Sequence, residues 1–204
     1  MQGTDRELLE AWRAGDRKAG DALFGRYFRS LFVFFSSKAS DAVEDLIGRT
    51  MTACLQSLHR FRDDGSFRSY LFGIARHELF GHYRRLRTEG AIDFGVTSVC
   101  DLAPGPSQWI HAHEEQQALV AALRQLPLEL QITLELHYWE DLTTAELAVA
   151  LEIPQGTVKS RLRRAREALA EQMRSGAEAP EVSVDALERW VRSIRAEADH
   201  ALDR

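Results

Sequence analysis

Residues 142–166 constrain the fold of this chain more than any other part of the sequence. Thr143 and Glu146 have the spacing of a capping box, which predicts that a short helix begins there and covers residues 143–151. Pro154 suits the first turn of a second helix, because the missing N–H of proline costs little at that position. Two short helices joined by a tight turn are typical of a helix-turn-helix unit.

The second helix, predicted over residues 154–174, is strongly basic near its start. Five of the eight residues 159–166 are Lys or Arg and none is acidic, while Val158 and Leu162 have the spacing to pack on the first helix. A basic second helix is typical of a reader of the DNA major groove, and the alternative is a solvated basic face on an ordinary helical hairpin. The first interpretation predicts DNA contacts through Thr157, Lys159, Ser160, Arg161, Arg163 and Arg164.

Apolar residues recur at helical spacing through most of the remaining sequence, and no sustained alternation of apolar and polar residues indicates a strand. The expected fold class is therefore all-α. Beyond the helix-turn-helix, helices are predicted over residues 5–15, 16–35, 41–61, 67–87, 113–126, 128–138 and 183–204.

Two breaks in the helical pattern predict two small helical domains. Between them, Gly, Pro and Ser accompany three acidic residues and no Lys or Arg, a composition that favours a flexible acidic linker able to occupy a basic groove. The second break follows the helix-turn-helix. The predicted organisation is a first domain over residues 1–88, the linker over 89–112, a helix-turn-helix domain over 113–175 and a C-terminal extension over 176–204 that carries an extra helix.

The predicted helix at residues 67–87 interleaves aromatic and basic side chains. That mixture suits a surface that neutralises phosphates and stacks on unpaired bases. Its aliphatic residues and Phe72 are equally well explained as core. The residues for which a core role is a weaker explanation, and which are predicted to contact DNA, are Tyr70, Arg76, His77, Tyr83, Arg84 and Arg85.

Charge and cysteine content exclude several classes of protein. The 26 Lys and Arg against 31 Asp and Glu give a net charge of -5, which argues against nonspecific coating of nucleic acid. Two cysteines are too few for a disulfide scaffold, and Cys100, His111 and His113 lack a fourth metal ligand at a usual spacing. Because no secretory signal, membrane span or catalytic arrangement is found, we expect a cytoplasmic protein without enzyme activity, cofactor or metal.

Residues 126–131 and 142–166 resemble the C-terminal DNA-binding region of bacterial sigma factors, especially those of the extracytoplasmic-function (ECF) group. The stretch at residues 70–85 is similar to the sigma segment that melts and reads the -10 promoter element. The resemblance implies a factor that binds core RNA polymerase and recognises promoter DNA, with the helix-turn-helix on the -35 element.

An acidic segment resembles the sigma helix that docks on the polymerase clamp, which implies polymerase contacts through Asp41, Glu44, Asp45, Leu46 and Ile47. The acids are also explained by the dipole at a helix N-terminus. Gly48 and Arg49 stand where the family usually has Gln and Glu. The neighbouring Thr50 and Thr52 are therefore hypothetical phosphorylation sites, at which a kinase would restore negative charge.

Two alternatives to the sigma interpretation stay open at this point. One is a helix-turn-helix transcription regulator, and the other is a sigma-like interaction protein that does not open promoters. An anti-sigma protein is a further hypothetical partner. The extra helix at residues 183–204 either packs on the second domain or masks a DNA or polymerase surface.

Overall fold

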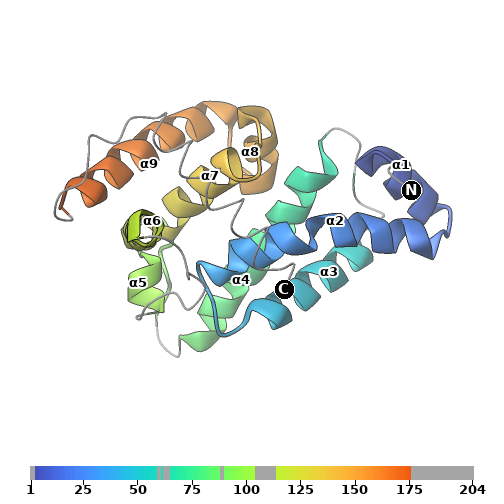
Figure 1. Cartoon of the computed structure of the whole chain (residues 1–204), viewed down its shortest axis with the longest axis horizontal. Helices are drawn as coiled ribbons and strands as arrows, with labels where there is room; N and C mark the ends of the chain where they lie inside the picture. Colours follow the sequence, from blue (N-terminus) through green and yellow to red (C-terminus); the bar gives the residue numbers. More distant parts are fainter. Residues whose placement is uncertain (1–2, 59–60, 62–64, 88–89, 104–113, 176–204) are drawn as a thin grey trace.

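The computed structural model describes residues 3–58, 61, 65–87, 90–103 and 114–175. Every regular element in these residues is a helix, which confirms the expected all-α class (Figure 1). The helices are α1 (Asp5–Arg13), α2 (Arg17–Ser36), α3 (Val43–Ser57), α4 (Phe67–Leu86), α5 (Val99–Leu102), α6 (Glu114–Gln125), α7 (Leu128–Tyr138), α8 (Thr144–Leu151) and α9 (Gln155–Ser175). None of them combines the length and apolar character needed to cross a membrane.

The predicted helix ranges agree with these bounds to within about one helical turn. Helix α5 was not predicted, because its four residues are too few to show a helical period. The helix predicted over residues 183–204 lies outside the described residues.

Helices α1 to α4 pack around an apolar core. Leu23 and Leu31 of α2, Leu46 of α3 and Phe72 of α4 are all fully buried. The ring of Phe72 meets the ring of Phe34 edge-on, with 5.5 Å between the ring centroids. Burial of large apolar side chains is the main favourable contribution to the stability of such a domain.

Helices α6 to α9 form a second core. Leu119 of α6, Ile132 of α7, Leu147 of α8 and Ala165 of α9 are fully buried at its centre. The second domain is therefore held by the inner faces of four helices, and the outer faces of α8 and α9 are left for other contacts.

Residues 90–103 lie in the first part of the predicted flexible linker, yet they pack against the helices. Phe94 is buried, and its ring stacks on Phe80 of α4 at 4.1 Å between centroids. Val99 of α5 is fully buried. These residues therefore differ from a flexible linker, because two of their apolar side chains enter the core. Residues 104–113 lie outside the described part of the chain.

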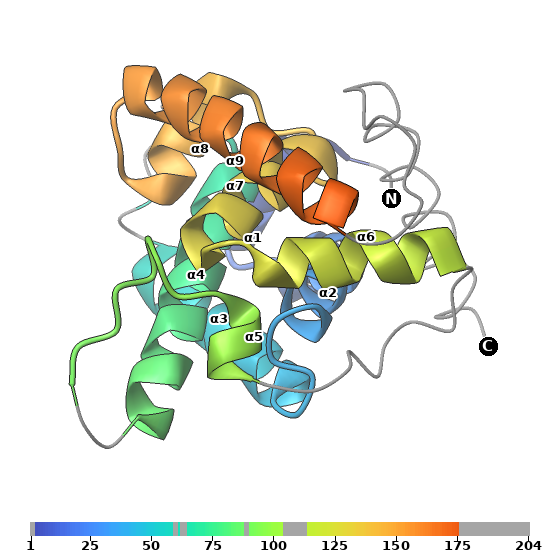
Figure 2. The same cartoon turned by 90° about the vertical axis from the view of Figure 1, so that its left-hand side faces the viewer.

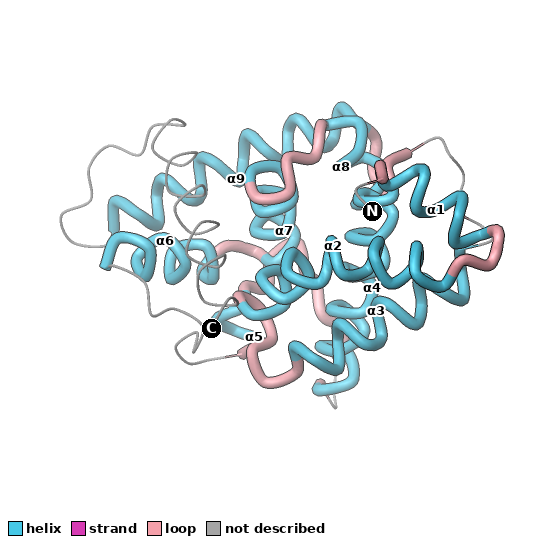
Figure 3. Tube along the Cα trace, turned by 45° about the vertical axis from the view of Figure 1, so that its right-hand side comes forward, coloured by secondary structure: helices cyan, strands magenta, loops and turns pink. Residues whose placement is uncertain are grey.

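The two domains lie against each other, with α4 of the first packed on α8 of the second (Figures 2 and 3). A Cβ atom at Gly73 of α4 would lie only 3.4 Å from the carbonyl oxygen of Ala150 in α8, so the glycine allows a close approach of the two helices. Beside it, Arg68 donates a hydrogen bond to the carbonyl oxygen of Glu140 at 2.6 Å. We call this arrangement the closed form.

Candidate nucleic-acid and polymerase interface

The predicted capping box begins α8. The Oγ1 atom of Thr143 accepts a hydrogen bond from the backbone N–H of Glu146 at 3.2 Å, and Oε2 of Glu146 accepts one from the backbone N–H of Thr143 at 2.9 Å. The helix ends at Leu151, and the cap residue Glu152 that follows has a left-handed φ of 56°. Pro154 directly precedes α9, and its carbonyl oxygen accepts the first helical hydrogen bond, from Val158 at 3.1 Å. The predicted helix-turn-helix is confirmed.

Helix α9 turns its apolar side to the domain core and a cationic side to solvent. Val158 and Leu162 are buried as predicted. Arg163 forms an exposed ion pair with Glu167 at 2.8 Å, and such pairs stabilise little, so phosphate can readily replace the carboxylate. The predicted DNA-contacting residues on the exposed side are Lys159, Ser160, Arg163 and Arg164, with Thr157 half-buried at its edge.

Arg161 differs from these residues because it is largely buried and paired with an acid of its own domain, on α7. Its Nη2 atom lies 2.8 Å from Oε2 of Glu129, and its side chain is 11% exposed. Arg76 of α4 approaches the same carboxylate, with 3.9 Å between Nη2 and Oε1 of Glu129. One predicted DNA-contacting arginine from each domain therefore shares the carboxylate of Glu129.

This cluster holds more cationic donors than acceptors. Glu152 is the second acid, 4.0 Å from Nη1 of Arg76 and 3.2 Å from Nε2 of His77. In the described part of the chain, the buried Nε of Arg76 and Nη1 of Arg161 have no hydrogen-bond acceptor. Burial also lowers the pKa of Arg76. Buried donors without acceptors cost free energy, so both guanidinium groups would gain from an added phosphate.

Two cations at the end of α4 face solvent. Arg84 and Arg85 are exposed. The linker meets Arg84 through the ring of Phe94, at 5.6 Å from the guanidinium carbon to the ring centroid. The linker that was predicted to occupy a basic groove thus meets this basic surface through an aromatic ring and not through an acid.

Two aromatic residues of α4 with the same predicted role have different surroundings. Tyr70 is half-buried, and its hydroxyl donates to Oγ of Ser57 at 2.5 Å. Tyr83 is buried in the core, and its hydroxyl donates to the carbonyl oxygen of Lys38. Burial raises the pKa of Tyr83 well above its ordinary value. The prediction that Tyr83 contacts DNA is wrong for this structure, because Tyr83 falls on the inner face of the helix.

The segment predicted to dock on polymerase divides into an exposed and a buried set. Asp41, Glu44 and Asp45 are exposed. Leu46 and Ile47 are buried, so they support the helix from the core and do not themselves form a docking surface, which corrects the prediction for these two residues. The acids define an accessible negative surface at the start of α3.

The two residues that depart from the family pattern follow this surface. Arg49 forms an ion pair with Asp45, at 2.9 Å between Nε and Oδ2. Gly48 is exposed, and a Cβ atom there would meet open space. The arginine therefore partly neutralises the acidic surface next to which it stands.

The two hypothetical phosphorylation sites differ in access. Thr50 is fully buried, and its hydroxyl donates to the carbonyl oxygen of Leu46 at 2.7 Å, so a kinase cannot reach it in this structure. Thr52 is exposed, and its hydroxyl donates to the carbonyl oxygen of Gly48 at 2.8 Å. Of the two, Thr52 alone fits the hypothesis.

The structure also describes the surroundings of both cysteines. Cys54 is buried and Cys100 is half-buried, and both are free thiols. Within the residues that the structure describes, no group of three or more His, Cys, Asp or Glu side chains could hold a metal ion. His111 and His113 lie outside those residues.

Sequence reasoning missed the contacts between the domains. In the sequence, Glu129 stands out only as part of a stretch that resembles the sigma family, and no pattern gives Gly73 or Glu152 a role. Glu152 is an acid three residues before the start of the cationic helix, which is a weak signal for an internal ion pair, whereas Glu129 lies 26 residues before that helix. Nothing in the local pattern pairs Gly73 with Ala150, because that contact depends on how two separate domains meet.

Comparisons with known proteins agree with this architecture. Residues 24–89 match Sigma-70 region 2 and residues 116–169 match Sigma-70 region 4, and the two matches together span more than half of the chain. The chain is 29% identical to the RNA polymerase sigma-H factor of Pseudomonas aeruginosa over 180 residues, which cover 82% of this chain and 93% of that protein. It is 28% identical to the ECF RNA polymerase sigma-E factor of Escherichia coli K12 over 178 residues, with the same two coverages.

Two solved structures have a similar fold. CnrH, determined in complex with the cytosolic domain of CnrY, has a TM-score of 0.62 at 20% identity and covers 85% of this chain and 99% of its own. The sigma factor RpoE of Bartonella quintana, determined with the anti-sigma factor NepR, has a TM-score of 0.56 at 22% identity and covers 79% of this chain and 98% of its own.

Two helical domains, one of them a helix-turn-helix with a cationic second helix, define a transcription factor built from two modules. With regions 2 and 4 both matched, the chain belongs to the sigma-70 family, in the extracytoplasmic-function group. It is a sigma factor that binds RNA polymerase and directs promoter recognition, and it carries out no enzymatic reaction of its own.

Proposed function

We propose that the two domains divide promoter recognition between them. The first domain, residues 1–88, docks on polymerase and melts the -10 element. The second, residues 113–175, reads the -35 element, and residues 89–112 connect the two domains. The observation that carries the proposal is the exposed cationic side of α9, which follows a capped helix and a tight turn.

The proposed -35 contacts come from the start of α9. Thr157, Lys159 and Ser160 lie within its first two turns, the part of a recognition helix that reaches base edges. Arg163 and Arg164 are exposed one turn later and would hold phosphates. Arg161 would join them once α4 and its Arg76 have moved away from the shared carboxylate of Glu129, so that a phosphate can approach.

The proposed -10 contacts come from the outer side of α4. Arg84 and Arg85 would neutralise phosphates at the end of the helix, and the half-buried Tyr70 offers a ring near its start. Arg76 and His77 become available when they leave Glu129 and Glu152.

The closed form cannot contact both promoter elements at once. The names of the -35 and -10 elements give their positions on the DNA, which are about 25 base pairs apart. At about 3.4 Å per base pair, this separation is about 85 Å. In the closed form, one arginine from each domain meets the same carboxylate of Glu129. Promoter binding therefore requires the domains to separate.

Polymerase docking is assigned to the exposed acids Asp41, Glu44 and Asp45 at the start of α3. Phosphorylation of Thr52, which lies farther along the same helix, would add negative charge next to Arg49 and strengthen the acidic surface. A kinase is thus one proposed regulator.

An anti-sigma protein is a second proposed regulator, supported by the complex of the similarly folded RpoE with NepR. The location we propose is the cytoplasm, where RNA polymerase acts. The C-terminal extension over residues 176–204 is proposed to carry an extra helix.

Run-off transcription with core RNA polymerase on a library of promoters with randomised -35 and -10 elements tests the proposed division of labour. We expect specific initiation that depends on one preferred sequence in each element. Duplex binding without initiation would contradict the melting role of the first domain. Initiation that ignores the -35 sequence would contradict the role of α9.

A further inference from the structure

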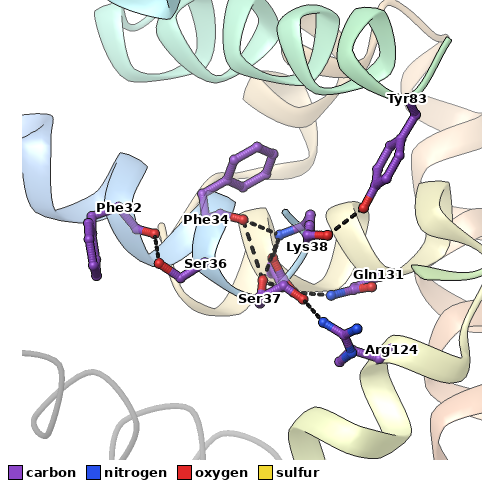
Figure 4. Close-up of polar contacts among 9 residues, drawn as sticks. Phe32, Phe34, Ser36, Ser37, Lys38, Tyr83, Arg124 and Gln131 are labelled. Carbon is purple, nitrogen blue, oxygen red and sulfur yellow. Dashed lines mark hydrogen bonds and ion pairs between the residues drawn. The ribbon is translucent and has the colours of Figure 1, made fainter. Parts of the chain in front are cut away.

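A buried ion pair joins the two domains just beyond the end of α2. Figure 4 shows the surroundings of its lysine, Lys38. Lys38 follows α2 and Glu135 lies on α7, and their side chains are 0% and 1% exposed. The Nζ atom of Lys38 donates to the carboxylate of Glu135, to Oγ of Ser37 at 3.0 Å and to the carbonyl oxygen of Phe34 at 2.7 Å. Gln131 donates to the other oxygen of Glu135 at 2.8 Å. The lysine therefore has an acceptor for each of its three donors.

The backbone that carries Lys38 is held from both domains. Tyr83 of α4 donates to the carbonyl oxygen of Lys38. Arg124 of α6, which is also buried, donates to the carbonyl oxygen of Ser37 at 3.0 Å and to that of Ala103 at 2.7 Å. Figure 4 shows Tyr83 and Arg124 approaching this turn from different sides. First domain, linker and second domain thus meet at a single turn of the chain.

The chemistry of this cluster favours an interface that is either fully closed or fully open. Burial lowers the pKa of Lys38 and raises that of Glu135, so each group depends on its partner to stay charged inside the interface. Removal of one partner leaves an uncompensated buried charge, whereas replacement of both by apolar residues of similar volume is often neutral. Separation of the domains, in contrast, returns both charges to water.

We propose that the Lys38–Glu135 pair, together with Arg124, is a latch that keeps the free chain closed and thereby withholds Arg76 and Arg161 from DNA. The latch opens when a binding partner separates the domains. The closure itself follows from the contacts described above, and the consequence for DNA rests on the proposed function of these arginines.

Small-angle X-ray scattering of the full chain, without DNA or polymerase, tests the latch. Glu135→Gln and Lys38→Met each leave one buried group without its charged partner, so the ratio of closed to open chains is expected to fall by about a hundredfold or more. The radius of gyration should then rise. In the double variant Lys38→Met/Glu135→Leu, the apolar pair should restore the compact form.

A control variant, a further test variant and a check of helicity make the scattering result decisive. Glu10→Gln removes an acid from the exposed Arg6–Glu10 pair and should leave the radius unchanged. Arg124→Gln removes a contact from the rim of the cluster and should also expand the chain. Circular dichroism measures the helicity of every variant, and closure is judged only on variants that keep the helicity of the parent. The proposal is overturned if the variants of full helicity stay as compact as the parent, or if the double variant is as expanded as the single ones.

Duplex binding by the same variants separates the latch from the proposed function. An expanded Glu135→Gln chain should bind a -35 duplex several-fold more tightly than the parent, because separation of the domains removes α4 and Arg76 from the side of Arg161. Expansion without tighter binding would support the proposed latch and count against the DNA role assigned to Arg161.

Discussion

Replacement of Lys159, Arg163 and Arg164 by alanine is expected to weaken binding of a -35 duplex by about 100-fold or more, since each lost contact costs about 1–3 kcal/mol. All three side chains are exposed on one side of α9, so their removal should leave the fold intact. The salt dependence should change too. Arg163 and Arg164 are the two proposed phosphate contacts, so their loss is expected to take about 1.8 from the slope of log K against log salt. Titrations at several salt concentrations measure both quantities.

Arg174→Ala is the matched control for this variant. Arg174 is an exposed arginine of the same helix, paired with Glu171 in the last turns of α9 and distant from the proposed recognition surface. Its replacement should alter neither the dissociation constant nor the salt slope measurably. Equal affinity and equal slope for the triple variant and the parent would remove α9 from the DNA interface.

Replacement of Phe72 by alanine is expected to destabilise the first domain by about 3–5 kcal/mol. Phe72 is fully buried and packs edge-on against Phe34, so truncation removes apolar contacts and leaves a cavity. Phe28→Ala is the matched control, because Phe28 lies on α2 with 45% of its surface exposed and should lose less than about 1 kcal/mol. The free energy of unfolding in urea measures both.

The comparison of Phe72→Ala with Phe28→Ala also shows whether Phe72 belongs to the core or to a base-stacking surface of α4. A residue kept for stacking on DNA contributes little to the stability of the free protein, whereas a core residue contributes much. A loss at Phe72 no larger than the loss at Phe28 would contradict the packing described for the first domain.

Much of the helix-turn-helix could be predicted from sequence because its determinants are local. The capping box of Thr143 and Glu146 acts over three residues, and the apolar spacing of Val158 and Leu162 fixes the inner face of α9. Such signals are complete within a short window, and the structure agrees with them.

The predictions for α3 and α4 were less successful because both faces of these helices carry residues of the same type. Tyr70 and Tyr83 stand in similar mixtures of aromatic and basic neighbours, yet Tyr83 is in the core and Tyr70 is at its edge. In the same way, Leu46 and Ile47 were grouped with the acids beside them although they face inward. Only the packing partners distinguish the inner face from the outer one.

Contacts between the domains left almost no local signal in the sequence. Lys38 is a single lysine after a helix, and its partner Glu135 lies 97 residues away. The shared use of Glu129 by Arg76 and Arg161 depends on the same docking of the two domains. Distant pairs of this kind follow from the tertiary arrangement, which periodicity and capping do not report.

A disulfide between the two domains tests the central claim that the closed form must open before transcription begins. A Cβ atom at Gly65 would lie 3.7 Å from Cγ1 of Val149, so Gly65→Cys and Val149→Cys are close enough to be bridged. Cys100 is replaced by serine, and Cys54 can stay, because burial raises the pKa of its thiol to about 12 and keeps it unreactive.

Run-off transcription by this cross-linked chain, before and after reduction, is the most direct measurement. The closed form is expected to support no initiation at a promoter with both elements while the disulfide is intact, and to recover the activity of the single-cysteine chains once it is reduced. Equal initiation by the oxidised and reduced chains, with the cross-link verified, would contradict the requirement for opening.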